Sequence, residues 1–105
     1  MPYRLKSGIP DMKRTPSHPR NVIGPTIARL RSARGMSQAQ LAAHCQRSGW
    51  DVSRSVIAAI EGRARWVGDF EAAILAQILA CELADLFPKK IDWAELNLPY
   101  LQIRR

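Results

Sequence analysis

Apolar side chains recur at helical spacing in four consecutive segments of the chain. They lie three or four residues apart, which places them on one face of an α-helix, and no convincing strand pattern appears before residue 88. The pattern predicts helices over residues 22–34, 37–48, 53–61 and 69–80, and a short fifth helix over 83–87. The expected core residues are Ile23, Ile27, Leu30, Leu41, Ala42, Cys45, Val56, Ile57, Ile60, Phe70, Ile74, Leu75, Ile78 and Leu79.

Residues that favour helix ends agree with these boundaries. Ser37 and Gln40 have the spacing of a capping box, in which the hydroxyl and the amide satisfy free backbone N–H groups. Ser53 and Asp69 are good N-caps for the third and fourth helices. Pro25 falls in the first turn of the first helix, where a missing N–H costs little. The residues expected to end the first, second, third and fifth helices are Gly35, Gly49, Gly62 and Pro88.

The two ends of the chain lack this pattern. Residues 1–20 hold four prolines and scattered basic residues without any period, so we expect a flexible basic arm that either contacts DNA or is a solvated tail. The helical domain then spans residues 21–88, and residues 89–105 form a short C-terminal extension. This extension is too apolar for a free tail, so it either covers the helical core or contributes to oligomerisation. Its apolar residues are Trp93, Leu96, Leu98, Tyr100 and Leu101.

The charge of the chain is strongly basic and unevenly distributed. Sixteen Lys and Arg stand against nine Asp and Glu, for a net charge of +7. The net charge is +4 over residues 1–21 and +5 over 22–66, but −2 over 67–105. A protein that grips phosphate with one face shows this asymmetry, although an acidic membrane surface is the alternative partner. No apolar run approaches the ~20 residues of a membrane span, and the N-terminus lacks the apolar stretch of a signal peptide. We therefore expect a cytoplasmic protein that does not bind a membrane.

Side chains with catalytic or metal-binding chemistry are isolated from one another in the sequence. Cys45 and Cys81 lie in apolar helical stretches, which favours two buried free thiols over a disulfide. His18 and His44 have no partner at metal-ligand spacing, so we expect no metal. Glu61 has no second acid, histidine or nucleophile at useful spacing. The sequence thus predicts a protein that is not an enzyme and needs no cofactor.

Several blocks of residues resemble the Cro/CI-type helix-turn-helix domain, the XRE family. The resemblance covers roughly two thirds of the chain, and the combination of the Ser37 and Ser53 blocks is its specific part. It implies a five-helix lambda-repressor-like bundle whose third helix enters the major groove of duplex DNA. The blocks are Ile27-Ala28-Arg29-Leu30-Arg31, Gly35-Met36-Ser37-Gln38-Ala39-Gln40-Leu41-Ala42, Val52-Ser53-Arg54-Ser55-Val56-Ile57 and Ile60-Glu61-Gly62-Arg63.

The resemblance also implies roles for individual residues. Gln38 would hydrogen-bond a phosphate, while Arg54 and Ser55 would reach base edges. Arg31 and Glu61 match a pair that forms a structural ion bridge in the family. The alternatives are a capping role for Gln38 and solvated charges at the arginines. The expected DNA-binding set is Gln38, Ser53, Arg54, Ser55, Ala58, Ala59, Arg63 and Arg65.

One segment departs from the family pattern. The connection between Ala42 and Ser53 is about five residues longer than usual, which predicts a longer second helix and a wider turn after it. Trp50 and Trp66 flank the third helix, and we expect both to brace this turn rather than stack on a base, with contact to a neighbouring chain as the alternative for Trp66. A further departure is Ala80-Cys81 at the end of the fourth helix, where glycine is usual.

These features predict a sequence-specific DNA-binding transcriptional regulator, a repressor, that acts as a homodimer because specific binding normally needs two half-sites. The alternatives are the antitoxin of a toxin–antitoxin operon, with its cognate toxin as partner, and a module that keeps the fold but binds protein. Bound to DNA, the protein would be associated with the nucleoid. The arginines expected to cluster around the third helix are Arg29, Arg31, Arg34, Arg54, Arg63 and Arg65.

Overall fold

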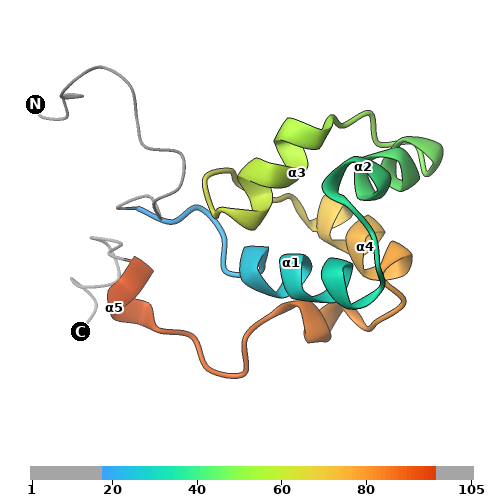
Figure 1. Ribbon diagram of the computed structural model, residues 1–105. Helices are drawn as coiled ribbons and strands as arrows, with labels where there is room; N and C mark the ends of the chain where they lie inside the picture. Colours follow the sequence, from blue (N-terminus) through green and yellow to red (C-terminus); the bar gives the residue numbers. More distant parts are fainter. Residues whose placement is uncertain (1–17, 97–105) are drawn as a thin grey trace, which may run out of the picture.

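All the regular structure of residues 18–96, which the computed structural model describes, is helical (Figure 1). The all-α fold predicted from the sequence is therefore confirmed, and the predicted helix boundaries agree to within two residues. No helix in this part of the chain is long and apolar enough to cross a membrane. The elements are α1 (Gly24–Ala33), α2 (Gln38–Arg47), α3 (Arg54–Glu61), α4 (Asp69–Ile78), the 3-10 helix η1 (Leu83–Leu86) and α5 (Trp93–Leu96).

The last two elements differ from the prediction. The expected fifth helix is a single 3-10 turn, η1, because Pro88 cannot continue a helix. The short helix α5 follows in the extension, whose structure the sequence pattern left open. Residues 1–17 of the predicted arm and 97–105 of the extension lie outside the described residues, and so do the expectations for Leu98, Tyr100 and Leu101.

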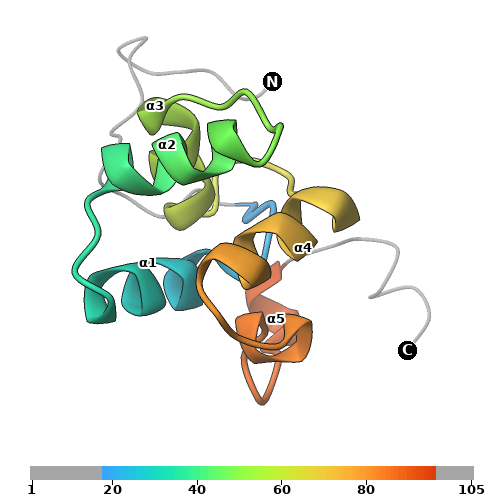
Figure 2. The ribbon, with the colours of Figure 1, turned by 90° about the vertical axis from the view of Figure 1, so that its right-hand side faces the viewer.

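One apolar core joins the first four helices and η1. The bundle packs α3 against both α2 and α1, and α4 against α2 (Figure 2). Its largest fully buried side chains are Ile27, Leu41, Cys45, Ile57, Ile60, Leu75, Leu79 and Leu86. Because α3 is anchored through Ile57 and Ile60, its opposite face is left for solvent or a ligand.

Phe70 was wrongly assigned to this core, because its side chain is 80% exposed. The buried face of α4 is formed by Ala72, Leu75 and Ala76, with Leu79 just beyond the helix. At about 100° per residue, Phe70 lies on nearly the opposite side of the helix from Leu75.

The helix ends were predicted well except at the start of α4. The Ser37–Gln40 capping box is present, and Ser53 caps α3 through a hydrogen bond to the Val56 N–H. Asp69, by contrast, is the first residue of α4 rather than its cap: the N-cap is Gly68, whose N–H donates to Glu71 Oε1 at 3.0 Å.

The third helix ends at Gly62, as predicted. Gly62 is the C-cap with an ordinary negative φ, and Arg63 takes the left-handed conformation with φ 64°. The end of α4 repeats this feature, since Ala80 has φ 57° where the family resemblance leads us to expect glycine. A left-handed residue with a Cβ is strained by roughly 1–2 kcal/mol. Both positions therefore store strain that the surrounding packing must hold.

The lengthened connection between α2 and α3 is an ordered loop. Gln46 Nε2 donates to the Val52 carbonyl at 2.7 Å, and Val52 itself is buried. Trp50 packs against the core, as expected. Trp66 does not brace the turn, because it is 66% exposed.

Candidate nucleic-acid interface

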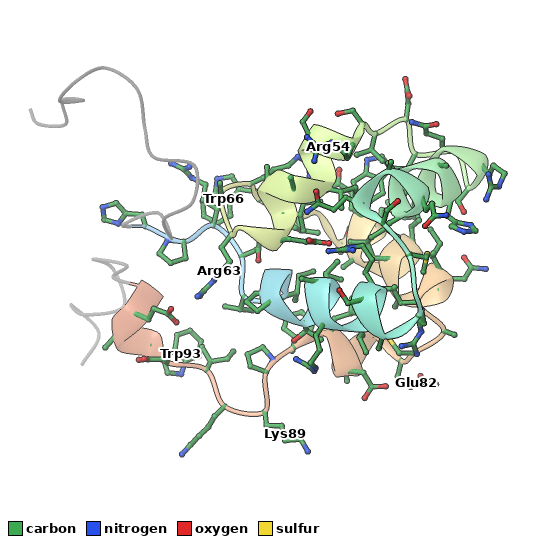
Figure 3. The ribbon with its side chains drawn as sticks, viewed as in Figure 1. Arg54, Arg63, Trp66, Glu82, Lys89 and Trp93 are labelled. Carbon is green, nitrogen blue, oxygen red and sulfur yellow. The ribbon has the colours of Figure 1, made fainter. Side chains whose placement is uncertain are left out.

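The outer face of α3 is polar at its start and built of small residues further along. Ser53, Arg54 and Ser55 are exposed, and Ala58 and Ala59 are half-buried. Figure 3 shows Arg54 on the outer side of α3, away from α1. Small side chains permit a close approach of the helix to another surface, and the arginine supplies a rigid fork of hydrogen-bond donors.

The N-terminus of α2 lies beside this face, and Gln38 connects the two helices. Arg54 Nη1 donates to Gln38 Oε1 at 2.8 Å. Gln38 Nε2 donates in turn to Glu61 Oε1 at 2.9 Å. The amide therefore lies between a guanidinium on α3 and a carboxylate at the end of the same helix.

Glu61 is also the partner of Arg31, which the family resemblance anticipated. Arg31 Nε and Nη2 donate to the two carboxylate oxygens at 2.6 and 3.1 Å, and Nη1 donates to the Met36 carbonyl at 2.7 Å. Only 15% of the Arg31 side chain and 8% of the Glu61 side chain are exposed. The hydrogen bond to Glu61 raises the pKa of Arg31, so the guanidinium stays charged. It ties α1 to the end of α3 and fixes the orientation of the outer face of α3.

Arg63, which belongs to the expected DNA-binding set, is bound to other parts of the chain. Its Nε donates to the Asn21 carbonyl at 3.1 Å, and Nη1 pairs with Glu95 of α5 at 2.6 Å. Only 13% of its side chain is exposed. In this conformation Arg63 joins the start of the domain to the C-terminal extension, and it can reach a phosphate only by leaving Glu95.

Arg65 is also bound to other side chains of the domain. It donates two hydrogen bonds to Glu71, at 2.9 and 3.2 Å, and its guanidinium carbon lies 5.9 Å from the centroid of the Trp50 ring. These hydrogen bonds lower the pKa of the Glu71 carboxyl. With 34% of its side chain exposed, Arg65 is more open to solvent than Arg63.

The expected cluster of six arginines around α3 does not form. Three of its members, Arg31, Arg63 and Arg65, are paired with carboxylates. Arg29 and Arg34 line a groove of about 900 Å³ between α1 and the segment 87–95. In Figures 1 and 2 the loop after η1 lies on the other side of α1 from α3, so this groove faces away from α3. The groove also contains Lys89 and Lys90.

Two residues that the sequence analysis missed hold the end of α3 in place. Asn21 Nδ2 donates to the carbonyls of Ile60 and Arg65, at 3.1 and 2.9 Å, and its Oδ1 accepts from the Gly24 N–H at 2.8 Å. Gly24 is buried, and a Cβ there would overlap the Ile60 carbonyl oxygen and lie 2.9 Å from that of Glu61. An asparagine three residues before a helix start was a visible capping signal, but its contacts across 39 and 44 residues of sequence were not.

Residues 18–96 contain no group of three or more His, Cys, Asp or Glu side chains that could hold a metal ion. Cys45 and Cys81 are free thiols, the first buried and the second half-buried.

Comparison with known proteins agrees with this geometry. No protein-family model matches the chain, and a search of curated proteins found no match. Among solved structures, the chain is similar to the restriction-modification controller protein C.AhdI from Aeromonas hydrophila, with 35% sequence identity and a TM-score of 0.54. The match covers 62% of this chain and 87% of the controller protein. The chain thus belongs to the family of helix-turn-helix regulatory proteins that includes C.AhdI.

Proposed function

We propose that this protein is a transcriptional repressor that binds duplex DNA sequence-specifically, with α3 in the major groove. The observation that carries the proposal is the outer face of α3, where exposed Arg54 and Ser55 precede the small side chains of Ala58 and Ala59. A recognition helix reads base edges with its first residues, and its small residues let it approach the groove wall. Arginine reads guanine through two hydrogen bonds, the commonest specific contact.

Phosphate contacts would flank this helix. The backbone N–H groups at the start of α2 lie beside α3 and suit an anion. Arg63 and Arg65 follow α3 directly, and each would exchange a carboxylate partner for a phosphate on binding. Because phosphate contacts carry little sequence information, Arg65→Ala should weaken binding to every duplex alike.

The similarity to C.AhdI indicates which genes the protein would regulate. We favour control of a restriction-modification system, because the matching protein is a controller of one. The antitoxin of a toxin–antitoxin operon is the second candidate. The neighbouring open reading frames separate the two, since the first predicts a nuclease and a methyltransferase beside this gene.

A homodimer would provide the two half-sites of an operator. Exposed apolar side chains would form the contact between the two subunits: Trp66, Phe70 and Trp93 are 66, 80 and 58% exposed. Truncation after Lys90 should then leave a folded monomer by light scattering. Because the truncation also removes the partner of Arg63, the matched control is the full-length Glu95→Gln variant, which should still dimerise.

The experiment that tests the function is selection of bound sequences from a random duplex pool. Arg54→Ala should lose the preference at one base pair of each half-site and weaken specific binding by roughly 5- to 150-fold. Arg47→Ala is the matched control, because Arg47 is exposed at the far end of α2 and contacts only His44. Specific binding should also weaken steeply with salt, by about 0.9 log units per log unit of salt for each phosphate contacted. Selection that enriches no sequence would reject the proposal and favour a module that binds protein.

A further inference from the structure

The groove between α1 and the segment 87–95 lies under a strap of chain that is anchored at both ends. At one end Leu86 is fully buried, and at the other Glu95 pairs with Arg63 at 2.6 Å. Between these anchors the strap runs below α1 in Figure 1, and the groove that it leaves measures about 900 Å³. Pockets for small molecules have volumes of about 300–1,000 Å³, so the groove has room for an organic ligand.

Apolar side chains line both walls of this groove. Helix α1 contributes Pro25 and Leu30, and the strap contributes Phe87, Pro88 and Ile91. Phe87 is 44% exposed. Apolar surface left in water forgoes the free energy that its burial would provide. A ligand with an apolar body would cover these side chains.

The acidic side chains of the groove are already engaged within the chain. Asp85 accepts a hydrogen bond from the Glu82 N–H at 3.0 Å, and Asp92 accepts one from the Glu95 N–H at 3.2 Å. The carboxylate of Glu95 is bound by Arg63. All three acids therefore have a hydrogen-bond donor before any ligand arrives.

The basic side chains on α1 lack such partners. Arg29 and Arg34 are exposed, and neither pairs with a carboxylate of residues 18–96. Arg34 makes only a long hydrogen bond, at 3.5 Å, to the Leu30 carbonyl. Lys89 and Lys90 add positive charge at the outer rim, where Figure 3 shows Lys89 projecting into solvent. Five basic and three acidic side chains line the groove, so its net charge is +2.

We propose that this groove binds a small organic anion, a molecule that carries a carboxylate or phosphate on an apolar body. Arg29 and Arg34 would bind the anionic group, because the guanidinium fork matches the oxygens of both carboxylate and phosphate. The apolar body would lie against Leu30 and Ile91. The groove faces away from α3, so this inference goes beyond the proposed function and does not depend on it.

Binding of anilinonaphthalene sulfonate to the full chain tests the site, because this dye is an aromatic anion whose fluorescence rises in an apolar environment. Arg29→Gln and Arg34→Gln should each weaken its binding roughly 2- to 5-fold, the effect of losing one partly solvated ion pair. Both arginines are exposed, so the variants should stay folded. Arg47→Gln is the matched control and should bind the dye as wild type does, since Arg47 is exposed at the end of α2 and lies outside the groove.

Competition shows whether the charge and the apolar body are both recognised. Octanoate should displace the dye, whereas octanol and inorganic phosphate at the same concentration should not. Displacement by octanol as effective as that by octanoate would show a merely apolar surface. Equally effective displacement by inorganic phosphate would show a simple counter-ion site. Either result overturns the proposal.

A second apolar surface that the dye can reach surrounds Phe70, which is 80% exposed. Phe70→Ser should leave the affinity for the dye unchanged, because Phe70 does not line the groove. If Phe70→Ser abolishes binding while both arginine variants retain it, the dye binds elsewhere and the proposal is rejected. Wild-type protein that binds no dye rejects it as well.

Discussion

Replacing Gly24 by alanine should destabilise the domain, because this glycine is where the start of α1 meets the end of α3. A Cβ at this position would overlap the Ile60 carbonyl oxygen and lie 2.9 Å from that of Glu61. Both obstacles are backbone atoms, so no side-chain rotation can relieve the overlap. Either α1 retreats from α3, or the hydrogen bonds that Asn21 makes to Gly24 and Ile60 are distorted.

The size of the effect follows from the rigidity of this junction. Inserting one extra methyl group into a packed site typically costs about 1–3 kcal/mol, and a backbone obstacle belongs at the upper end. One kcal/mol lowers the unfolding midpoint of a domain of this size by about 4–8 °C. We therefore expect a fall of about 10 °C or more in the thermal midpoint.

Thermal unfolding followed by circular dichroism measures this shift, and Gly62→Ala is the matched control. Gly62 caps the same end of α3 with a negative φ, and a Cβ there would lie 3.4 Å from the Ala58 carbonyl oxygen, an ordinary contact. The control should change the midpoint by only a few degrees. Equal midpoints for the Gly24 and Gly62 variants would refute the argument from close approach.

Three further predictions concern other side chains. Glu61→Ala should lower the free energy of unfolding by about 3 kcal/mol, since it leaves a largely buried guanidinium unpaired, and a negligible shift in a urea midpoint would contradict this. Glu95→Gln should release Arg63 and raise affinity for any duplex by about 2- to 5-fold at low salt, more than Glu82→Gln, which removes an exposed charge without releasing an arginine. Burial raises the pKa of Cys45 to about 11, so this thiol should resist alkylation at pH 8 until the protein unfolds; labelling at the rate of a free thiol would refute its burial.

The part of this fold that could be predicted from the sequence is the part that local patterns determine. Helical spacing located α1 to α4, and the capping box at Ser37 and the cap at Ser53 were visible as residue pairs a few positions apart. Phe70 was misassigned because the helical spacing of apolar residues is only loosely defined near the start of a helix. Whether its side chain faces the core depends on how far the packed helices extend around it.

The contacts that hold the interface could not be predicted in the same way. Asn21 and Gly24 act on residues about forty positions away, and nothing in their neighbourhood of the sequence indicates those partners. The pairing of Arg63 with Glu95 depends on the course of the extension, whose structure its mixed composition left open. The Arg31–Glu61 pair was anticipated only through the family resemblance.

The ion pairs reduce the share of the chain's positive charge that is available to attract phosphate. A basic total of +7 suggests an arginine-rich surface around the recognition helix. Three of the arginines nearest that helix instead hold the framework together through carboxylates, and Arg54 is the exposed one on α3. Paired arginines attract phosphate weakly, because the carboxylate cancels most of their field at a distance. On the proposed function, Arg63 and Arg65 therefore add to the affinity for DNA only after each leaves its carboxylate partner. Discrimination between sequences then depends heavily on how rigidly the single exposed arginine of α3 is held.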